Sequence, residues 1–113
     1  MTSKKLANTE WQSFFDRVSK GLAGTRAEIE IASLALGDQV VAEWLPLIGL
    51  VYDPKSDAIE VALEGLDHII RKPRDVYVDE MAGQLASLAV IDAEGTEQIV
   101  RLRQPLALPA PQH

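Results

Sequence analysis

The 113-residue chain contains no cysteine. Disulfide bridges, thiolate metal sites and a cysteine nucleophile are therefore excluded, and the absence fits a reducing compartment. Histidine is scarce as well, because His68 and His113 are its two representatives. A closed zinc site built from a single chain is accordingly not expected. We predict neither a metal ion nor a cofactor.

Long apolar runs are also missing. The longest strongly apolar stretch without a charge, Trp44 to Tyr52, is too short to span a bilayer. Lys4 and Lys5 are followed by polar residues rather than by the apolar core of a signal peptide. A net charge of −6 makes the surface repel phosphate backbones and anionic membranes. We therefore expect a cytoplasmic protein that binds neither nucleic acid nor membranes.

Short motifs of the common catalytic and nucleotide sites are absent: there is no G-x-S-x-G, no P-loop and no H-E-x-x-H. The stretch "GLAGT", residues 21–25, has two glycines but no lysine, and we interpret it as the end of a helix. "DPKSD", residues 53–57, contains two spaced aspartates. Calcium takes about six to eight oxygen ligands, so this stretch favours a tight turn over a calcium loop.

An amphipathic helix is the first regular pattern. Thr9, with Gln12 three residues later, has the form of a capping box. Apolar residues then recur at the spacing of one helix face, and glycines end the helix. The face consists of Trp11, Phe14, Phe15, Val18 and Leu22. At this spacing the aromatic residues favour a face that packs on a sheet over a stripe that binds a partner.

Beyond residue 25 the apolar residues alternate with polar ones, which is typical of half-buried strands. Pro46 and Gly49 mark an edge, bend or bulge within the extended stretch 40–52. We predict an α+β fold in which one N-terminal helix packs on a mostly antiparallel, twisted or partly rolled sheet of six to seven short strands. Residues 1–113 are treated as a single domain, with a flexible lead-in over 1–8 and a proline-rich tail without regular structure over 105–113.

His68 is the one candidate for a catalytic residue. In a strand from Leu66 to Arg71 it shares a face with Leu66 and Ile70, whereas Asp67 points to the opposite side. A catalytic His68 would need a carboxylate or serine from a neighbouring strand. Candidates for this partner are Glu60, Glu64, Asp75, Asp79 and Ser87. The alternative, which we favour, is a structural histidine packed on apolar neighbours with one ring nitrogen hydrogen-bonded.

Basic residues beyond Lys55 fall in two stretches of the chain. They are Arg71, Lys72, Arg74, Arg101 and Arg103. If the strands that carry them are neighbours, they form a cationic patch suited to a phosphate or carboxylate ligand. Nearby acidic residues offer the competing interpretation of a solvated, ion-paired face, which we favour. These acidic residues are Asp75, Asp79, Glu80 and Glu97.

The ordered segments "W..FFD..S", "AEIEIASLALGDQ", "AEWLPLIGLVYDPKSDAIEVALEGLDHIIRKP", "VYVDE" and "RQPLALP" resemble a bacterial family, the domain of unknown function 5335. The resemblance covers residues from about Trp11 to Pro109 and follows strands and turns rather than a catalytic motif. It implies a small, stand-alone bacterial protein. No functional residue comes with it.

Two functions from different classes remain open at this point. The first is a non-enzymatic binding or interaction module that self-associates or binds another protein or a small anionic ligand, with the apolar tail 105–111 covering a sheet edge or docking on a second copy. The alternative is a small hydrolase-like or isomerase-like enzyme that uses His68 with a carboxylate. Such an enzyme would place its pocket between subunits, because a chain of this length builds a deep pocket most readily there.

Overall fold

The computed structural model describes residues 2–22 and 24–107. Its elements, in chain order, are β1 (Thr2–Leu6), the 3₁₀ helix η1 (Asn8–Glu10), α1 (Trp11–Lys20), β2 (Arg26–Ser33), β3 (Gly37–Asp53), β4 (Ala58–Leu63), β5 (Leu66–Arg71), β6 (Pro73–Met81), β7 (Gln84–Asp92) and β8 (Glu97–Leu106). The predicted class, one helix with a mostly antiparallel sheet, is confirmed. The number of strands is eight rather than six to seven.

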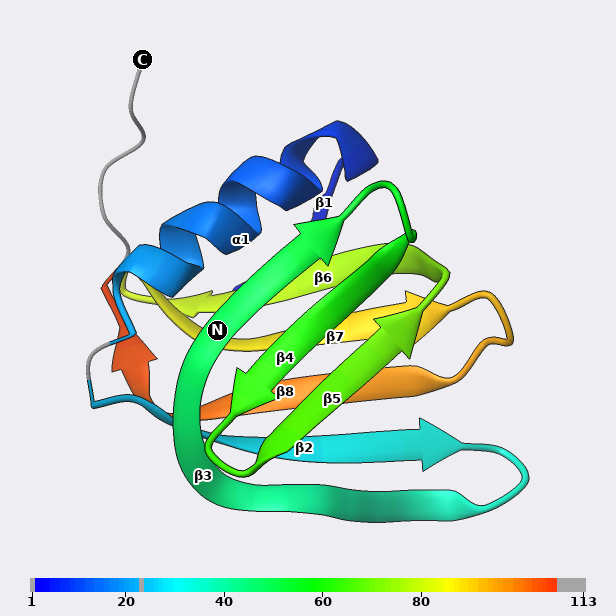
Figure 1. Cartoon of the computed structure of the whole chain (residues 1–113). Helices are drawn as coiled ribbons and strands as arrows, with labels where there is room; N and C mark the ends of the chain where they lie inside the picture. The colour runs from blue at the N-terminus through cyan, green and yellow to red at the C-terminus, as the bar shows by residue number, and fades with distance from the viewer. Residues whose placement is uncertain (1, 23, 108–113) are drawn as a thin grey trace.

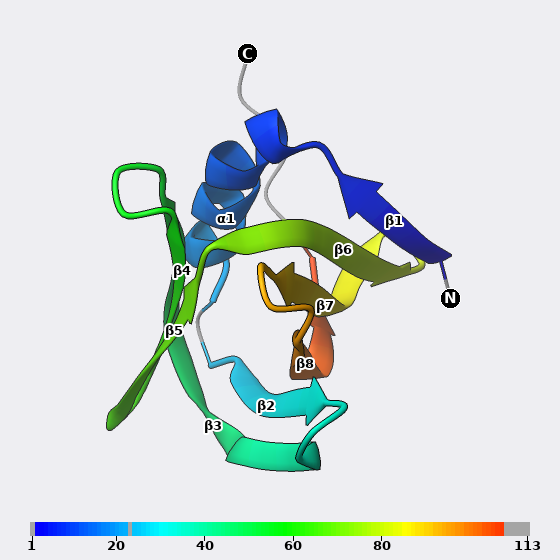
Figure 2. The same cartoon turned by 90° about the vertical axis from the view of Figure 1, so that its right-hand side faces the viewer.

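The strands form one sheet in the order β1-β6-β7-β8-β2-β3-β4-β5, and each neighbouring pair is antiparallel. β3 takes part in two regions of this sheet, since its first half pairs with β2 and its second half with β4. The sheet thereby folds over itself. The second half of β3, with β4 and β5, crosses in front of β6, β7, β8 and β2, and α1 lies between the two layers at one end (Figures 1 and 2).

Local irregularities in β3 produce this fold-over. The register of β3 shifts against β2 and again between Leu47 and Gly49 against β4. An extra residue at such a bulge bends a strand and increases its twist. Trp44 adopts a φ of 52°, in the left-handed region. The bend that Pro46 and Gly49 predicted is therefore present, but β3 continues through it as one strand of 17 residues.

Apolar side chains from α1 and from both layers meet in one core. Its largest fully buried members include Phe15, Ile29, Leu50, Ile59, Ile70 and Val76. Trp11 of α1 packs edge-to-face on Tyr52 of β3, with ring centroids 5.3 Å apart. The predicted helix face is confirmed, because Trp11, Phe14, Phe15, Val18 and Leu22 are all buried.

A single hydroxyl group attaches α1 to the backbone of β3. Ser19 Oγ donates to the carbonyl of Leu50 at 2.7 Å and accepts from the Leu50 N–H at 2.9 Å. These two backbone groups point away from β4, and Ser19 therefore occupies the place of a residue on a neighbouring strand. The helix thus covers the second edge of β3, which would otherwise carry unpaired backbone groups.

Three local predictions are wrong. Residues 2–6 are not a flexible lead-in but pair with β6, where Lys5 also reaches Asp75 at 3.2 Å. Thr9 does not cap α1, because it lies inside η1 and the residue before α1 is Glu10. The Glu10 side chain accepts the Ala7 N–H through Oε1 at 3.1 Å. Pro105 and Leu106 belong to β8, where Leu106 pairs with Leu85 of β7, whereas the tail beyond residue 107 lies outside the described residues.

Within the described ranges, no helix has the length and apolarity needed to cross a membrane.

Candidate functional site

His68 lies in β5 with its side chain directed into the space between the two layers. It pairs with Val61 of β4, which is fully buried, and its own side chain is half-buried. Ile70 is buried on the same face, whereas Leu66 at the start of the strand is 37% exposed. β5 ends at Arg71, two residues before Pro73, and Pro73 is itself the first residue of β6.

The imidazole of His68 is joined to the opposite layer by a short polar chain. Its Nε2 lies 2.6 Å from Oε1 of Gln98 on β8, and Gln98 Nε2 donates to Asp92 Oδ2 at 3.2 Å. Asp92 Oδ1 accepts the N–H groups of Glu94 and Thr96 in the β7–β8 turn, each at 3.0 Å. A carboxylate accepts and does not donate, so the amide orientation of Gln98 leaves Oε1 as an acceptor and His68 Nε2 as the donor.

This arrangement differs from the catalytic one that the sequence left open. The hydrogen bond of His68 goes to an amide, and not to Glu60, Glu64, Asp75, Asp79 or Ser87. Glu60 and Glu64 are exposed, and Asp75 binds Lys5 and Arg74 instead. Because Nε2 is engaged as a donor, a base would have to be the other ring nitrogen, Nδ1. The geometry favours a structural cross-link between β5 and β8.

No group of three or more His, Cys, Asp or Glu side chains is placed to hold a metal ion in the part of the chain that the structure describes.

β5 ends the strand order, so one side of it carries no neighbouring strand among the described residues. The Lys72 N–H donates to the Asp57 carbonyl at 2.8 Å. This bond shows which residues of β5 direct their backbone groups toward β4 and which direct them away. The Lys72 N–H and both backbone groups of every second residue before it point toward β4, whereas the Lys72 carbonyl accepts from the Ala93 N–H of the β7–β8 turn at 2.9 Å. The backbone groups of Asp67, Ile69 and Arg71 consequently point to the free side.

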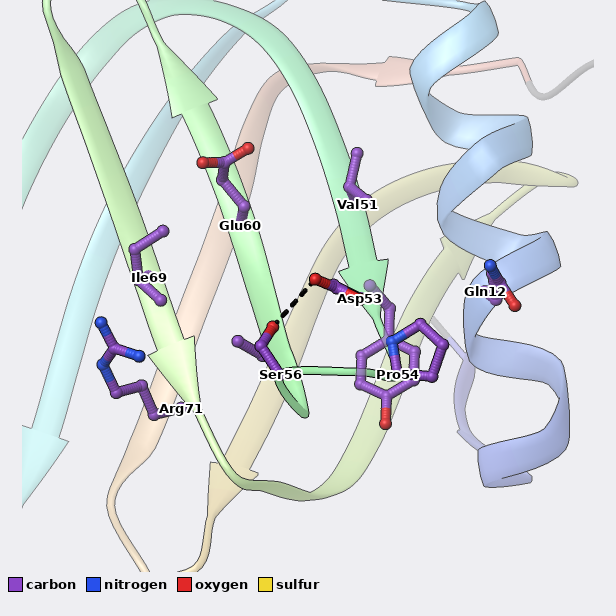
Figure 3. A pocket seen from close by; sticks show the side chains of 10 residues that line it. Gln12, Val51, Asp53, Pro54, Ser56, Glu60, Ile69 and Arg71 are labelled. Carbon is purple, nitrogen blue, oxygen red and sulfur yellow. Dashed lines mark hydrogen bonds between the residues drawn. The ribbon is translucent and has the colours of Figure 1, made fainter.

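The outer face of this layer is partly apolar. Val51 of β3, Glu60 of β4 and Ile69 of β5 stand side by side in one row across the three strands (Figure 3). Val51 and Ile69 are 42% and 36% exposed. Arg71 and the 53–57 turn complete the walls of a hollow of about 450 Å³ on this face. The apolar row reaches the free edge at Ile69.

The five basic residues of the predicted patch are distributed over separate surfaces. Arg74 binds Asp75 at 3.1 Å, and Arg101 binds Glu28 and Glu30 of β2 at 3.3 and 2.6 Å. Arg71 and Lys72 flank the β7–β8 turn. Arg103 lies at the far end of β8, in a hollow that it shares with Arg26.

Ion pairs with Arg101 and Arg74 lower the pKa of two carboxyl groups, those of Glu30 and Asp75. The Arg101 guanidinium holds the pKa of Glu30 below its usual range through a direct hydrogen bond. The Arg74 guanidinium, followed by the Lys5 ammonium, lowers the pKa of Asp75 in the same way. Charge-assisted hydrogen bonds favour the ionised carboxylate. Arg74 and Arg101 are thus occupied by partners of the same chain.

The model of a family of unknown function, DUF5335, matches residues 2–111. The chain belongs to this family. An uncharacterised protein of Aquifex aeolicus (strain VF5) is 38% identical over 110 residues, which make up 96% of this chain and 99% of the relative. No solved structure gives a significant match. The predicted resemblance is confirmed, and neither comparison assigns a role to a residue.

Sequence reasoning missed two features of this DUF5335 chain. Gln98 has an ordinary polar position in an alternating strand, and nothing local indicates that it is buried against a residue 30 positions away. The free edge of β5 depends on strand order, which hydrophobic alternation does not reveal. A signal was present nonetheless: Asp67 and Arg71, of opposite charge, stand at equal spacing on either side of Ile69.

Proposed function

We propose that this chain is a non-enzymatic interaction module that pairs with a second copy of itself through the free edge of β5. The observation that carries the proposal is the self-complementarity of that edge. Its unpaired backbone groups belong to Asp67, Ile69 and Arg71, and the two charges are placed symmetrically about an exposed isoleucine. The proposal places the module in the bacterial cytoplasm, which the lack of cysteine fits.

The register follows from the direction of the backbone groups. In an antiparallel pair, residues that point toward the partner lie directly opposite one another. A two-fold axis at Ile69 sets Ile69 against Ile69 of the second copy, and Asp67 of each chain against Arg71 of the other. Opposite charges in such pairs stabilise by about 0.2–1 kcal/mol each. The same surface serves both copies, as a two-fold interface requires.

The surroundings of β5 offer the space and the apolar contact for a second strand. A hollow of about 440 Å³ lies between Ile69, Arg71, Lys72 and the β7–β8 turn. Pairing would extend the row of Val51, Glu60 and Ile69 across the dimer axis. Figure 2 shows β5 at the rim of its layer with no strand on its outer side.

The other sheet edges fit a second copy less well. β1 carries Lys4 and Lys5, and lysines on an edge strand discourage pairing by repulsion. The first half of β3 is interrupted by register shifts and by the left-handed residue Trp44. Bulges of this sort prevent regular pairing of an edge. β5 has an uninterrupted register with β4, and it contains neither a lysine nor a bulge that would discourage pairing.

The substitution Ile69→Pro tests edge pairing without disturbing the fold. The Ile69 N–H points away from β4, and proline is tolerated on an edge strand where its missing N–H faces solvent. We expect the parent chain and an Ile69→Val control to sediment as dimers from about 1 to 100 µM, and Ile69→Pro as a folded monomer with an unchanged circular dichroism spectrum.

Charge reversal tests the register. Asp67→Arg alone and Arg71→Asp alone place like charges opposite one another and should weaken the dimer, whereas the double variant restores the pairing and the dimer. A parent chain that is monomeric throughout this range would refute the proposal. So would a dimer that survives Ile69→Pro and both single reversals, because its interface would then lie elsewhere.

A further inference from the structure

Arg26 and Arg103 meet at the end of the β2–β8 pair that is remote from the β7–β8 turn. The register joins Ala27 to Leu102, so Arg26 and Arg103 occupy the next opposed positions. Both side chains are exposed and line one hollow of about 420 Å³. The backbone and side chains of Gly24, Thr25 and the segment 104–106 form the rest of its wall.

Two arginines in opposed positions destabilise each other unless an anion neutralises them. The chain has 17 Asp and Glu residues against 11 Lys and Arg, and carboxylates are paired with Lys5, Arg74 and Arg101 elsewhere. Among residues 2–22 and 24–107, no carboxylate lines the hollow or lies within ion-pair distance of Arg26 or Arg103. On an acidic chain this is a local concentration of positive charge.

The backbone orients one of the two guanidinium groups. Arg26 Nη1 donates to the carbonyl of Trp44 at 3.0 Å. Trp44 is the left-handed residue of β3, and its unusual backbone angle is therefore part of the bend that brings this carbonyl to Arg26. One nitrogen of the guanidinium is thus held, and the Arg26 side chain lines the hollow together with Arg103. A planar group fixed in this manner loses less entropy when it binds an oxyanion.

We propose that the hollow between Arg26 and Arg103 binds a small oxyanion, a phosphate or a carboxylate. Both classes present two or more oxygens to a guanidinium fork, and two such forks on adjacent strands hold the anion from both sides. The anion would neutralise the opposed arginines without a carboxylate of the same chain. This site lies on strands other than β5, so it is independent of the proposed pairing.

Titration calorimetry on the full chain tests the site, with inorganic phosphate and acetate as separate probes at constant ionic strength. Arg26→Gln and Arg103→Gln should each weaken binding by about tenfold or more. The control is Arg74→Gln, which removes the same charge from an arginine already bound to Asp75. It should leave the dissociation constant within about twofold of the parent value.

The pattern over the two probes identifies the class of anion. Saturable phosphate binding without acetate binding assigns the site to phosphate groups, and the reverse assigns it to carboxylates. The proposal is overturned if neither probe binds at millimolar concentration. It is also overturned if Arg74→Gln weakens binding as much as Arg26→Gln and Arg103→Gln, because the effect would then be one of net charge.

Discussion

His68 and Gln98 form a side-chain contact between the two layers of the sheet, with Nε2 and Oε1 2.6 Å apart across 30 residues of sequence. Gln98 is the buried polar residue of the described core. Gln98 is hydrogen-bonded to His68 on one side and to Asp92 on the other. Asp92 in turn accepts the backbone N–H groups of the β7–β8 turn. The position of β5 over β8 is therefore linked to the geometry of a turn in the opposite layer.

Gln98→Leu should destabilise the fold by about 1–3 kcal/mol, because it leaves the His68 ring without its partner in a half-buried place. His68→Gln keeps hydrogen-bonding capacity and should have a smaller effect. In the double variant His68→Leu/Gln98→Leu, the loss should be smaller than the sum of the losses in the single variants His68→Leu and Gln98→Leu. Urea unfolding measures the free energies of the parent chain and of these variants. Strict additivity of the two leucine substitutions would contradict the coupling.

Ser19→Ala should also destabilise the chain by about 1–3 kcal/mol. The substitution removes both hydrogen bonds to Leu50, a fully buried residue whose backbone N–H and C=O then lack partners. Ser13→Ala is the matched control, since Ser13 Oγ donates one exposed bond of 3.2 Å to the carbonyl of Glu10 in η1. Urea unfolding of both variants should separate them clearly. Equal stabilities would mean that water replaces Ser19 at no cost.

Phe15→Ala should cost about 3–5 kcal/mol, because Phe15 is fully buried between α1 and the sheet. Gln12→Ala, on the exposed side of the same helix, should leave the stability nearly unchanged. Thermal unfolding by circular dichroism compares the two. If the melting temperature of Phe15→Ala falls within a degree of the parent value, the helix face does not hold the core together.

Sequence patterns predicted the parts of this fold that local physics determines. The helix face from Trp11 to Leu22 and the turn at residues 53–57 follow from spacing and turn chemistry. β1 was missed because its polar residues have no alternation, and its strand conformation depends on pairing with residues of β6 that are 70 or more positions away. The contacts of Ser19 and Gln98 were missed for the same reason: each joins residues that only the folded sheet brings together.

Strand order also limited what the sequence could predict about the candidate site. His68 could be placed on the inner face of a strand from its neighbours alone, but its partner could not be named. The basic residues could be identified from the sequence, whereas their separation onto different surfaces depends on β8 lying between β7 and β2. Arg26 entered no prediction, because nothing in the sequence indicates that it lies opposite Arg103.

Arg101→Gln should make the stability of the fold less dependent on acid. The pKa of Glu30 is lowered in the folded chain by the hydrogen bond from Arg101, so the folded state binds fewer protons than the unfolded state when this carboxyl titrates. The resulting stabilisation is fully present above the ordinary glutamate pKa of about 4.3 and is lost as the pH falls through the lowered value. The difference in unfolding free energy between the parent chain and Arg101→Gln should therefore be largest near neutrality and shrink as the pH falls below the ordinary glutamate pKa.

Arg103→Gln provides the control, since it removes the same charge two positions further along β8. No carboxylate of the described residues pairs with Arg103, so its effect on stability should vary much less over the acid range. Urea unfolding in sodium chloride solutions adjusted with hydrochloric acid avoids phosphate and carboxylate buffers, which would bind at the proposed anion site. If the two variants show the same pH profile, the contribution of Glu30 is one of general charge, and the 2.6 Å contact with Arg101 has no specific effect on acid stability.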